Sequence, residues 1–168
     1  MNGKGEKILF DMLVKLYDLK NDSDLFEQLK SRGIRLKRAM ASDRNRILDF
    51  VDAQFGEGWA CECANALSEN PMNCFIAISE KRIIGFACFH CTSKNFFGPT
   101  GVLECMRGQR IGEALLKKCL YAMESEGYGY AIIGGVSSAK GFYEKTVGAT
   151  VIPGSALGVY NRLIQSEE

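Results

Sequence analysis

The sequence feature that most restricts the fold is a succession of strand, glycine turn, helix and strand between residues 96 and 133. An extended apolar stretch (96–104) leads into a glycine-containing turn (107–112), and apolar residues then recur at spacings of three and four over 114–123. Such spacing is typical of a helix with one buried face, and a helix between two strands favours a parallel crossover. The segment therefore predicts an α/β domain in which a helix begins at the carboxyl end of the sheet.

The rest of the chain supplies further helices and strands for the same kind of domain. Apolar spacing predicts a helix over residues 5–19 and a short helix over 24–33, so that residues 1–33 form a helical extension to a domain over 34–168. Gly98, Pro99 and Gly101 predict a bend in the strand at 96–104. We also predict strands at 34–40, 74–79, 83–91, 149–152 and 159–164, the last two as a hairpin, and helices at 42–55, 59–68 and 139–146.

Length, charge and cysteine usage limit the classes of function. The 168 residues suffice for one packed α/β domain with at most a short appendage. The chain has 21 basic and 20 acidic side chains, so its net charge is +1. This charge gives no electrostatic field strong enough to hold a nucleic acid. No apolar run reaches the roughly 18 residues of a membrane span, and the seven cysteines are scattered and odd in number. We therefore expect a reduced, cytoplasmic protein without nucleic-acid or membrane partners.

The turn at 107–112 has the properties of a diphosphate-binding loop. The first amides of a helix have no partner inside the helix, and the helix dipole adds partial positive charge at the same point. Gly108 and Gly112 allow the backbone to approach a ligand closely, and Arg107 and Arg110 can add charge. An ordinary glycine turn before a core helix is the alternative interpretation of the same residues.

A longer pattern surrounds this turn. Val102 stands five residues before Arg107, and the turn continues as Arg-Gly-Gln-Arg-Ile-Gly-Glu-Ala-Leu-Leu. Downstream come Ala-Lys-Gly-Phe-Tyr-Glu-Lys at 139–145 and then Gly148-Ala149. The first pattern resembles the acetyl-CoA motif of the GNAT superfamily of N-acetyltransferases, and the second resembles that family's other cofactor segment. The resemblance covers residues 34–164 and implies an α/β fold with a mixed, mostly antiparallel sheet, a splayed central strand and helices on both faces.

The resemblance also implies a cofactor site for acetyl-CoA, without a metal. In the family the pantetheine lies along the splayed strand, where a backbone amide holds the thioester carbonyl, a role that falls by position on Val102 and the stretch 103–105. Arg110 stands where the family motif usually has glycine. Val136 stands where many members carry an asparagine bonded to the pantetheine, so that contact is absent or is replaced by Ser137 or Ser138. The cofactor-binding residues implied are Val102, Leu103, Arg107, Gly108, Gln109, Arg110, Ile111, Gly112, Glu113, Ala114, Ser138, Phe142 and Tyr143.

Two side chains are candidates for catalysis. Tyr143 matches the tyrosine that protonates the departing thiolate of coenzyme A in many members, although a packing role beside Phe142 is the alternative. The attacking amine must lose a proton, so a carboxylate is expected nearby, and Glu104 is the first candidate. Glu57 and Glu62 are lower-ranked candidates for the base. They lie in a region that is expected to line the acceptor pocket, together with Trp59 and Tyr160. The acceptor implied is a primary amine of a small molecule or peptide.

Other functions fit the sequence less well or remain open. Cys88 and Cys91, together with Cys61 and Cys63, suggest a zinc site, but residues three apart on a strand project to opposite faces, which favours small buried side chains instead. His90 is the single histidine and lies too close to Cys91 for a cysteine hydrolase. A catalytically inactive acyl-CoA-binding sensor or interaction module is the remaining alternative. The predicted N-terminal helices could pack on their own domain, cover the acceptor site or form a homodimer.

Overall fold

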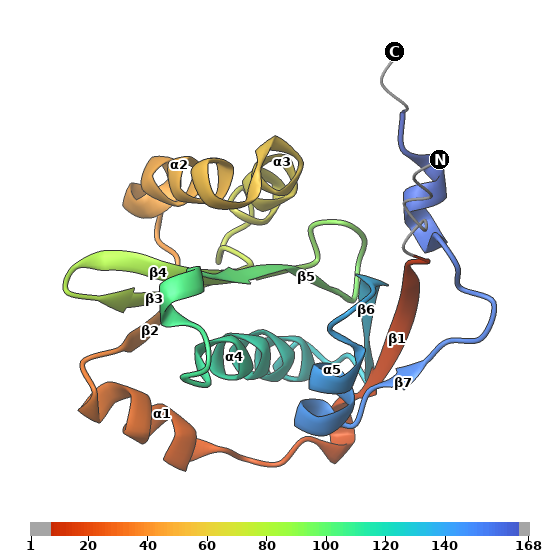
Figure 1. Cartoon of the computed structure of the whole chain (residues 1–168), viewed down its shortest axis with the longest axis horizontal. Coiled ribbons are helices and arrows are strands. Elements are labelled where there is room, and N and C mark those ends of the chain that lie inside the picture. Colours follow the sequence, from red (N-terminus) through yellow and green to blue (C-terminus); the bar gives the residue numbers. More distant parts are fainter. Residues whose placement is uncertain (1–7, 165–168) are drawn as a thin grey trace, which may run out of the picture.

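The computed structural model describes residues 8–164, which form one mixed sheet flanked by helices (Figure 1). Seven strands lie in the order β2-β3-β4-β5-β6-β1-β7, and every pairing is antiparallel except that of β5 with β6. The elements are β1 (Phe10–Lys15), α1 (Ser23–Ser31), β2 (Arg35–Arg38), α2 (Arg44–Phe55), α3 (Glu57–Ala66), β3 (Cys74–Ser79), β4 (Arg82–Phe89), β5 (Phe96–Val102), α4 (Ile111–Ser125), β6 (Tyr130–Val136), α5 (Lys140–Val147) and β7 (Thr150–Val151).

The helix expected over residues 5–19 is wrong, because residues Phe10–Lys15 form strand β1 between β6 and β7. Met12 and Val14 are completely buried, two residues apart, which is the spacing of a strand. The same segment also has apolar residues three and four apart, as a helix does, so its sequence fits both a helix and a strand. Its pairing on both sides, with β6 and with β7, decides for the strand, and residues 10–15 are therefore not part of a helical extension. Residues 1–7 of the expected helix lie outside the described residues. The short helix expected next is confirmed as α1.

The sheet carries a hydrophobic core on each face. Helices α2 and α3 cover one face, and α1, α4 and α5 lie on the other (Figure 1). Helix α4 supplies the apolar stripe that the sequence predicted, with Leu115, Cys119 and Met123 completely buried in the larger core. The smaller core lies under α2 and α3 and contains Ile47 and Phe86. The helices on the two faces of the sheet are therefore packed firmly against it, above and below β5.

Strand β5 bends and separates from β6, as its glycines and proline predict. It pairs with β4 up to Val102, and the register shifts between Ala87 and Phe89, opposite Gly98. In the described part of the chain its parallel pairing with β6 is limited to Phe96 with Ile132 and Phe97 with Ile133. Beyond these pairs the two strands diverge, which leaves backbone groups on one edge of β5 open.

The final hairpin differs from the expected one. Thr150–Val151 forms β7, but its neighbour in the sheet is β1, through Met12 with Val151 and Leu13 with Thr150. The expected partner strand at 159–164 is wrong, because Gly158–Arg162 forms a short 3-10 helix. The Tyr160 ring of that helix lies against β6, close enough that a Cβ at Gly135 would be 3.0 Å from it. The segment therefore packs against β6, near the point where β5 and β6 separate, and adds no strand to the sheet.

Candidate functional site

The amides at the start of α4 are free to bind a ligand, as expected. Helix α4 begins at Ile111, and the first amide with a backbone partner is that of Ala114, which donates to the carbonyl of Arg110 at 3.1 Å. Within residues 8–164, the amides of 108–113 donate no hydrogen bond to another protein group. A run of unpaired amides beside a helix N-terminus is suited to a diphosphate.

Arg110 occupies a backbone conformation that favours glycine. Its φ is +64°, and Gly108 two residues earlier has a φ of +77°. A residue with a side chain in this left-handed region is strained. The guanidinium of Arg110 is held by Glu113, with Nε to Oε2 at 2.8 Å and Nη2 to Oε1 at 2.9 Å. The departure from the family motif is therefore accommodated by a side chain that turns back onto α4.

The strain at Arg110 gives a first testable prediction. Both Arg110→Gly and Arg110→Ala remove the ion pair with Glu113, but only glycine relieves the left-handed backbone. We expect the glycine variant to be more stable to urea than the alanine variant by about 1 kcal/mol. Equal stability of the two variants would show that the backbone at this position carries no strain.

Four charged groups meet at this turn. Lys117 contacts Glu113 at 2.9 Å and also Asp22, which lies before α1, while Arg110 lies 3.8 Å from Asp22. The hydrogen bond from Arg110 lowers the pKa of Glu113 to about 2, against the cost of partial burial and with help from Lys117. Arg110 and Lys117 are thus positioned beside the free amides, each already paired with a carboxylate.

Two cavities meet at the point where β5 and β6 diverge. The larger, of about 1020 Å³, extends from the start of α4 along β5 to α5. The smaller, of about 560 Å³, lies between α3, β5, β6 and the segment around the 3-10 helix Gly158–Arg162. Trp59, Thr100 and Tyr143 line both cavities, together with Phe97 and Ala139. A group bound at the α4 turn and a second molecule in the smaller cavity would therefore meet beside Tyr143.

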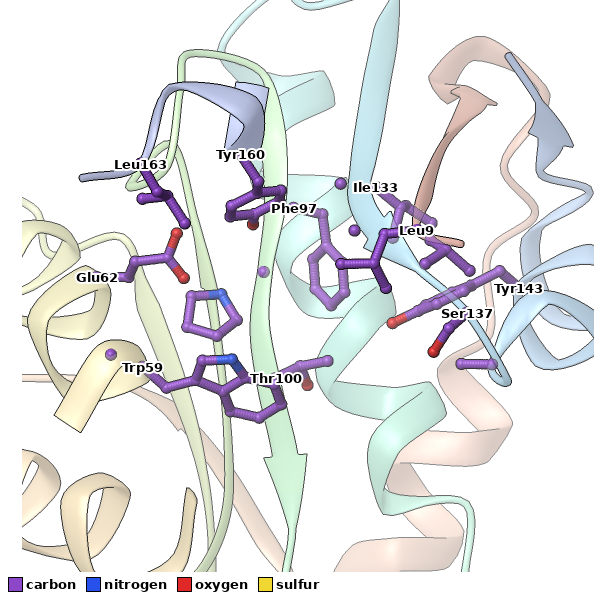
Figure 2. Close-up of a pocket in the computed structure, with 17 residues that line it drawn as sticks. Leu9, Trp59, Glu62, Phe97, Thr100, Ile133, Ser137, Tyr143, Tyr160 and Leu163 are labelled. Carbon is purple, nitrogen blue, oxygen red and sulfur yellow. The ribbon is translucent and has the colours of Figure 1, made fainter. Parts of the chain in front are cut away.

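Tyr143 is the buried polar side chain at this junction. It is 8% exposed and packs edge-on against Phe97 with 6.3 Å between the ring centroids. Its hydroxyl points into the smaller cavity (Figure 2) and donates to no protein group within residues 8–164. Burial raises the pKa of Tyr143 to about 12, so the phenol keeps its proton at neutral pH. The group is therefore available as a proton donor.

Glu62 faces Tyr143 across the smaller cavity (Figure 2). It projects from α3 and accepts a hydrogen bond from the Thr92 hydroxyl at 2.7 Å. Among the described residues that line this cavity, it is the one carboxylate, and its neighbours are mostly apolar or aromatic. Burial raises the pKa of Tyr160 on the same wall, and the nearby charge of Glu62 adds to the effect. The cavity thus offers one negative charge and aromatic walls to a bound molecule.

Most of the predicted cofactor residues lie together. Leu103 does not join them, because its N–H donates to the carbonyl of Ile84 at 2.9 Å and its side chain packs on the core. Successive residues of an antiparallel strand turn their amides to opposite sides, so the Val102 N–H points away from β4 into the splay. The predicted residues that line the larger cavity are Val102, Arg107, Gly108, Arg110, Ile111, Gly112, Glu113, Phe142 and Tyr143.

Three other predicted residues lie outside both cavities. Ala114 is completely buried in the core with its amide bonded inside the helix. Gln109 contributes one of the free amides, whereas its carbonyl accepts a hydrogen bond from Arg32 at 2.9 Å. Ser138 is exposed, and Ser137 lines the smaller cavity instead. The side chains of these three residues therefore have no contact with the proposed ligand space.

Glu104 is not where the sequence placed it. Strand β5 ends at Val102, and Glu104 begins a 3-10 turn (Glu104–Met106) with an exposed side chain that lines neither cavity. Glu57 is also exposed and outside both cavities. The structure brings Glu62, the lower-ranked candidate, together with Tyr143. Thr100 was missed, since nothing in its local sequence distinguishes it, and Lys117 was signalled only by its spacing of four from Glu113.

A family profile described as "acetyltransferase (GNAT) domain" matches residues 70–146. This range contains the free turn of α4, the splayed strand and nearly all of α5. Residues 70–146 are thus similar to a GNAT acetyltransferase domain. The fold of the described residues is that of the GNAT superfamily.

Solved structures share this fold at low sequence identity. A GCN5-related glucosamine N-acetyltransferase region of a fungal multi-domain beta-N-acetylglucosaminidase superposes with a TM-score of 0.71 and 14% identity, over 88% of this chain and 20% of that one. A GCN5-related N-acetyltransferase from Sphaerobacter thermophilus gives 0.66 and 18%, over 86% and 48%. A GNAT family acetyltransferase from Brucella melitensis, in complex with acetyl-CoA, gives 0.50 and 18%, over 65% and 80%.

The chain spans less than half the length of the first two of these structures. No curated protein matches the sequence. Among residues 8–164, no helix has both the length and the apolar character needed to cross a membrane.

Proposed function

We propose that this protein transfers an acetyl group from acetyl-CoA to a primary amine held in the smaller cavity. The observation that carries the proposal is the meeting of two cavities at Tyr143. One of them begins at the amides of residues 108–113, which have no hydrogen-bond partner in the described part of the protein. A volume of about 560 Å³ is within the range of small-molecule sites, which favours a small amine over a folded protein as acceptor. The cytoplasmic location expected from the sequence stays a prediction.

The residues of the larger cavity fit coenzyme A. The free amides at the start of α4 suit its diphosphate, and Arg107 lies on the same wall with its Nε 3.3 Å from the carbonyl of Val102. The Val102 amide, which faces the splay, is available to the thioester carbonyl. A preorganised donor at that atom typically contributes about 10² to 10³ in rate.

The residues of the smaller cavity fit an amine acceptor. Glu62 attracts a protonated amine and then accepts its proton, directly or through water, so that the nitrogen can attack the acyl carbon. Tyr143 gives its proton to the sulfur as the carbon–sulfur bond breaks. The two side chains lie on opposite sides of the cavity, one for each proton transfer (Figure 2).

The proposal is tested in two steps on the purified chain. Saturating acetyl-CoA should raise the melting temperature, and free thiol should then be released faster in the presence of an amine than without one. The panel of acceptors should include polyamines, amino sugars, aminoglycosides, arylalkylamines and peptide N-termini. A thermal shift without thiol release from any acceptor would favour an acyl-CoA-binding module, and no thermal shift would reject the cofactor site itself.

A further inference from the structure

Three thiols lie together on the face of the sheet that α3 covers. Cys63, Cys74 and Cys88 are completely buried, and their sulfur atoms lie within 4.8 Å of one another. None of the three lines either cavity, so the mechanism above gives them no role. Their packing in a hydrophobic core is the simplest explanation, but it does not require sulfur at three adjacent positions.

The fold itself brings these sulfur atoms to one point. Cys74 and Cys88 stand directly opposite each other on β3 and β4, so their side chains share a face of the sheet. Cys63 reaches the pair from α3, with its sulfur 3.6 Å from that of Cys88. A tetrahedral zinc ion with zinc–sulfur bonds of about 2.3 Å holds its sulfur ligands about 3.8 Å apart. The 3.6 Å between the sulfur atoms of Cys63 and Cys88 is close to this value, and all three sulfur atoms lie within 4.8 Å of one another.

A fourth cysteine packs in the same hydrophobic core. Strand β4 ends at Phe89 and His90 has a φ of +60°, so the chain turns before Cys91 instead of continuing as a strand. Cys91 consequently packs in the same buried core as Cys63, Cys74 and Cys88, with its thiol 2.9 Å from the carbonyl of Gly98. The strand alternation that argued against zinc therefore does not apply to Cys88 and Cys91.

We propose that Cys63, Cys74 and Cys88 bind a zinc ion, with Cys91 turning from Gly98 to become the fourth ligand. Four sulfur ligands and full burial are the features of a closed, structural zinc site. The site would fasten α3 to β3 and β4. Because α3 also carries Trp59 and Glu62, the ion would hold one wall of the smaller cavity in place without taking part in the reaction.

The test compares the metal content of variants in which one cysteine is replaced by alanine. Chains produced with zinc in the medium and dialysed should retain about one zinc ion per chain in the parent protein. Cys63→Ala and Cys88→Ala should lose it. Two controls should keep it: Cys119→Ala, which removes a buried thiol from the opposite face, and Cys61→Ala, which removes an exposed thiol from α3 itself.

A second measurement does not depend on the folding of the variants. The parent chain, freed of metal and given cobalt(II), should develop the charge-transfer absorption of cobalt thiolates, and zinc should abolish it. Zinc should also raise the melting temperature of the metal-free chain. The proposal is rejected if Cys63→Ala retains as much zinc as the parent, if cobalt gives no thiolate band, or if the chain binds copper(I) and not zinc.

Discussion

Replacing Tyr143 by phenylalanine should lower kcat by about 10² to 10⁴ while acetyl-CoA still binds. The substitution removes one hydroxyl from a ring that is otherwise packed against Phe97 and Phe142, so the fold and the walls of both cavities should persist. Without this proton donor the thiolate must leave as an anion or take a proton from water. Single-turnover thiol release measures the chemical step, and the thermal shift with acetyl-CoA measures binding.

Tyr160→Phe is the matched control for this prediction. Tyr160 lines only the smaller cavity, so loss of its hydroxyl should change the KM for the amine more than kcat. The pH dependence adds a second check. Because burial raises the pKa of Tyr143 to about 12, the acid stays protonated over the working range and should cause no loss of rate below that pH. Turnover by Tyr143→Phe equal to that of the parent would remove Tyr143 as the acid.

The parts of the site predicted from sequence are those that depend on local chain geometry. The free amides of 108–113 follow from a glycine turn that opens a helix, and both features are encoded within a few residues. The bend in β5 is encoded in the same way by Gly98, Pro99 and Gly101. Tyr143 was found because its segment resembles a known motif, and a short helix then fixes the direction of its side chain.

The parts that sequence analysis placed wrongly depend on contacts between distant segments. The spacing of the apolar side chains in residues 10–15 fits either a helix or a strand. Their pairing with β6 and β7, which lie more than a hundred residues away in sequence, selects the strand. That strand also occupies the position beside β7 that 159–164 was expected to fill. Because Gly158–Arg162 then folds as a 3-10 helix, Tyr160 comes to lie beside Glu62 on one wall of the smaller cavity.

The choice of the general base also depended on contacts between distant segments, which the sequence does not show. Glu104 was preferred because it was expected to continue the strand that carries Val102, two residues earlier. In the structure the strand ends at Val102, and the 3-10 turn that follows exposes Glu104. Glu62 is separated from β5 by more than thirty residues of sequence, and only the packing of α3 on the sheet brings it to the cavity.

Glu62→Gln should therefore lower kcat/KM for the amine by about 10² to 10⁴, whereas Glu104→Gln and Glu57→Gln should have little effect. Glutamine has nearly the same shape and its carbonyl can still accept the hydrogen bond from Thr92, so the variant removes the charge and the basic group without opening a hole. Acetyl-CoA binding should be unchanged, because Glu62 does not line the larger cavity. Steady-state kinetics with the best acceptor of the panel measure each variant.

The pH dependence separates a base from a residue that merely binds the amine. An alkylamine with a pKa of about 10.4 becomes deprotonated in solution as the pH rises. If Glu62 removes the proton, the deficit of Glu62→Gln should shrink toward high pH, because the free amine then reaches the site without needing a base. If Glu62 acts only through its charge, the KM should rise at neutral pH while kcat stays near that of the parent. A normal kcat/KM in Glu62→Gln together with a large loss in Glu104→Gln would return the role of base to Glu104.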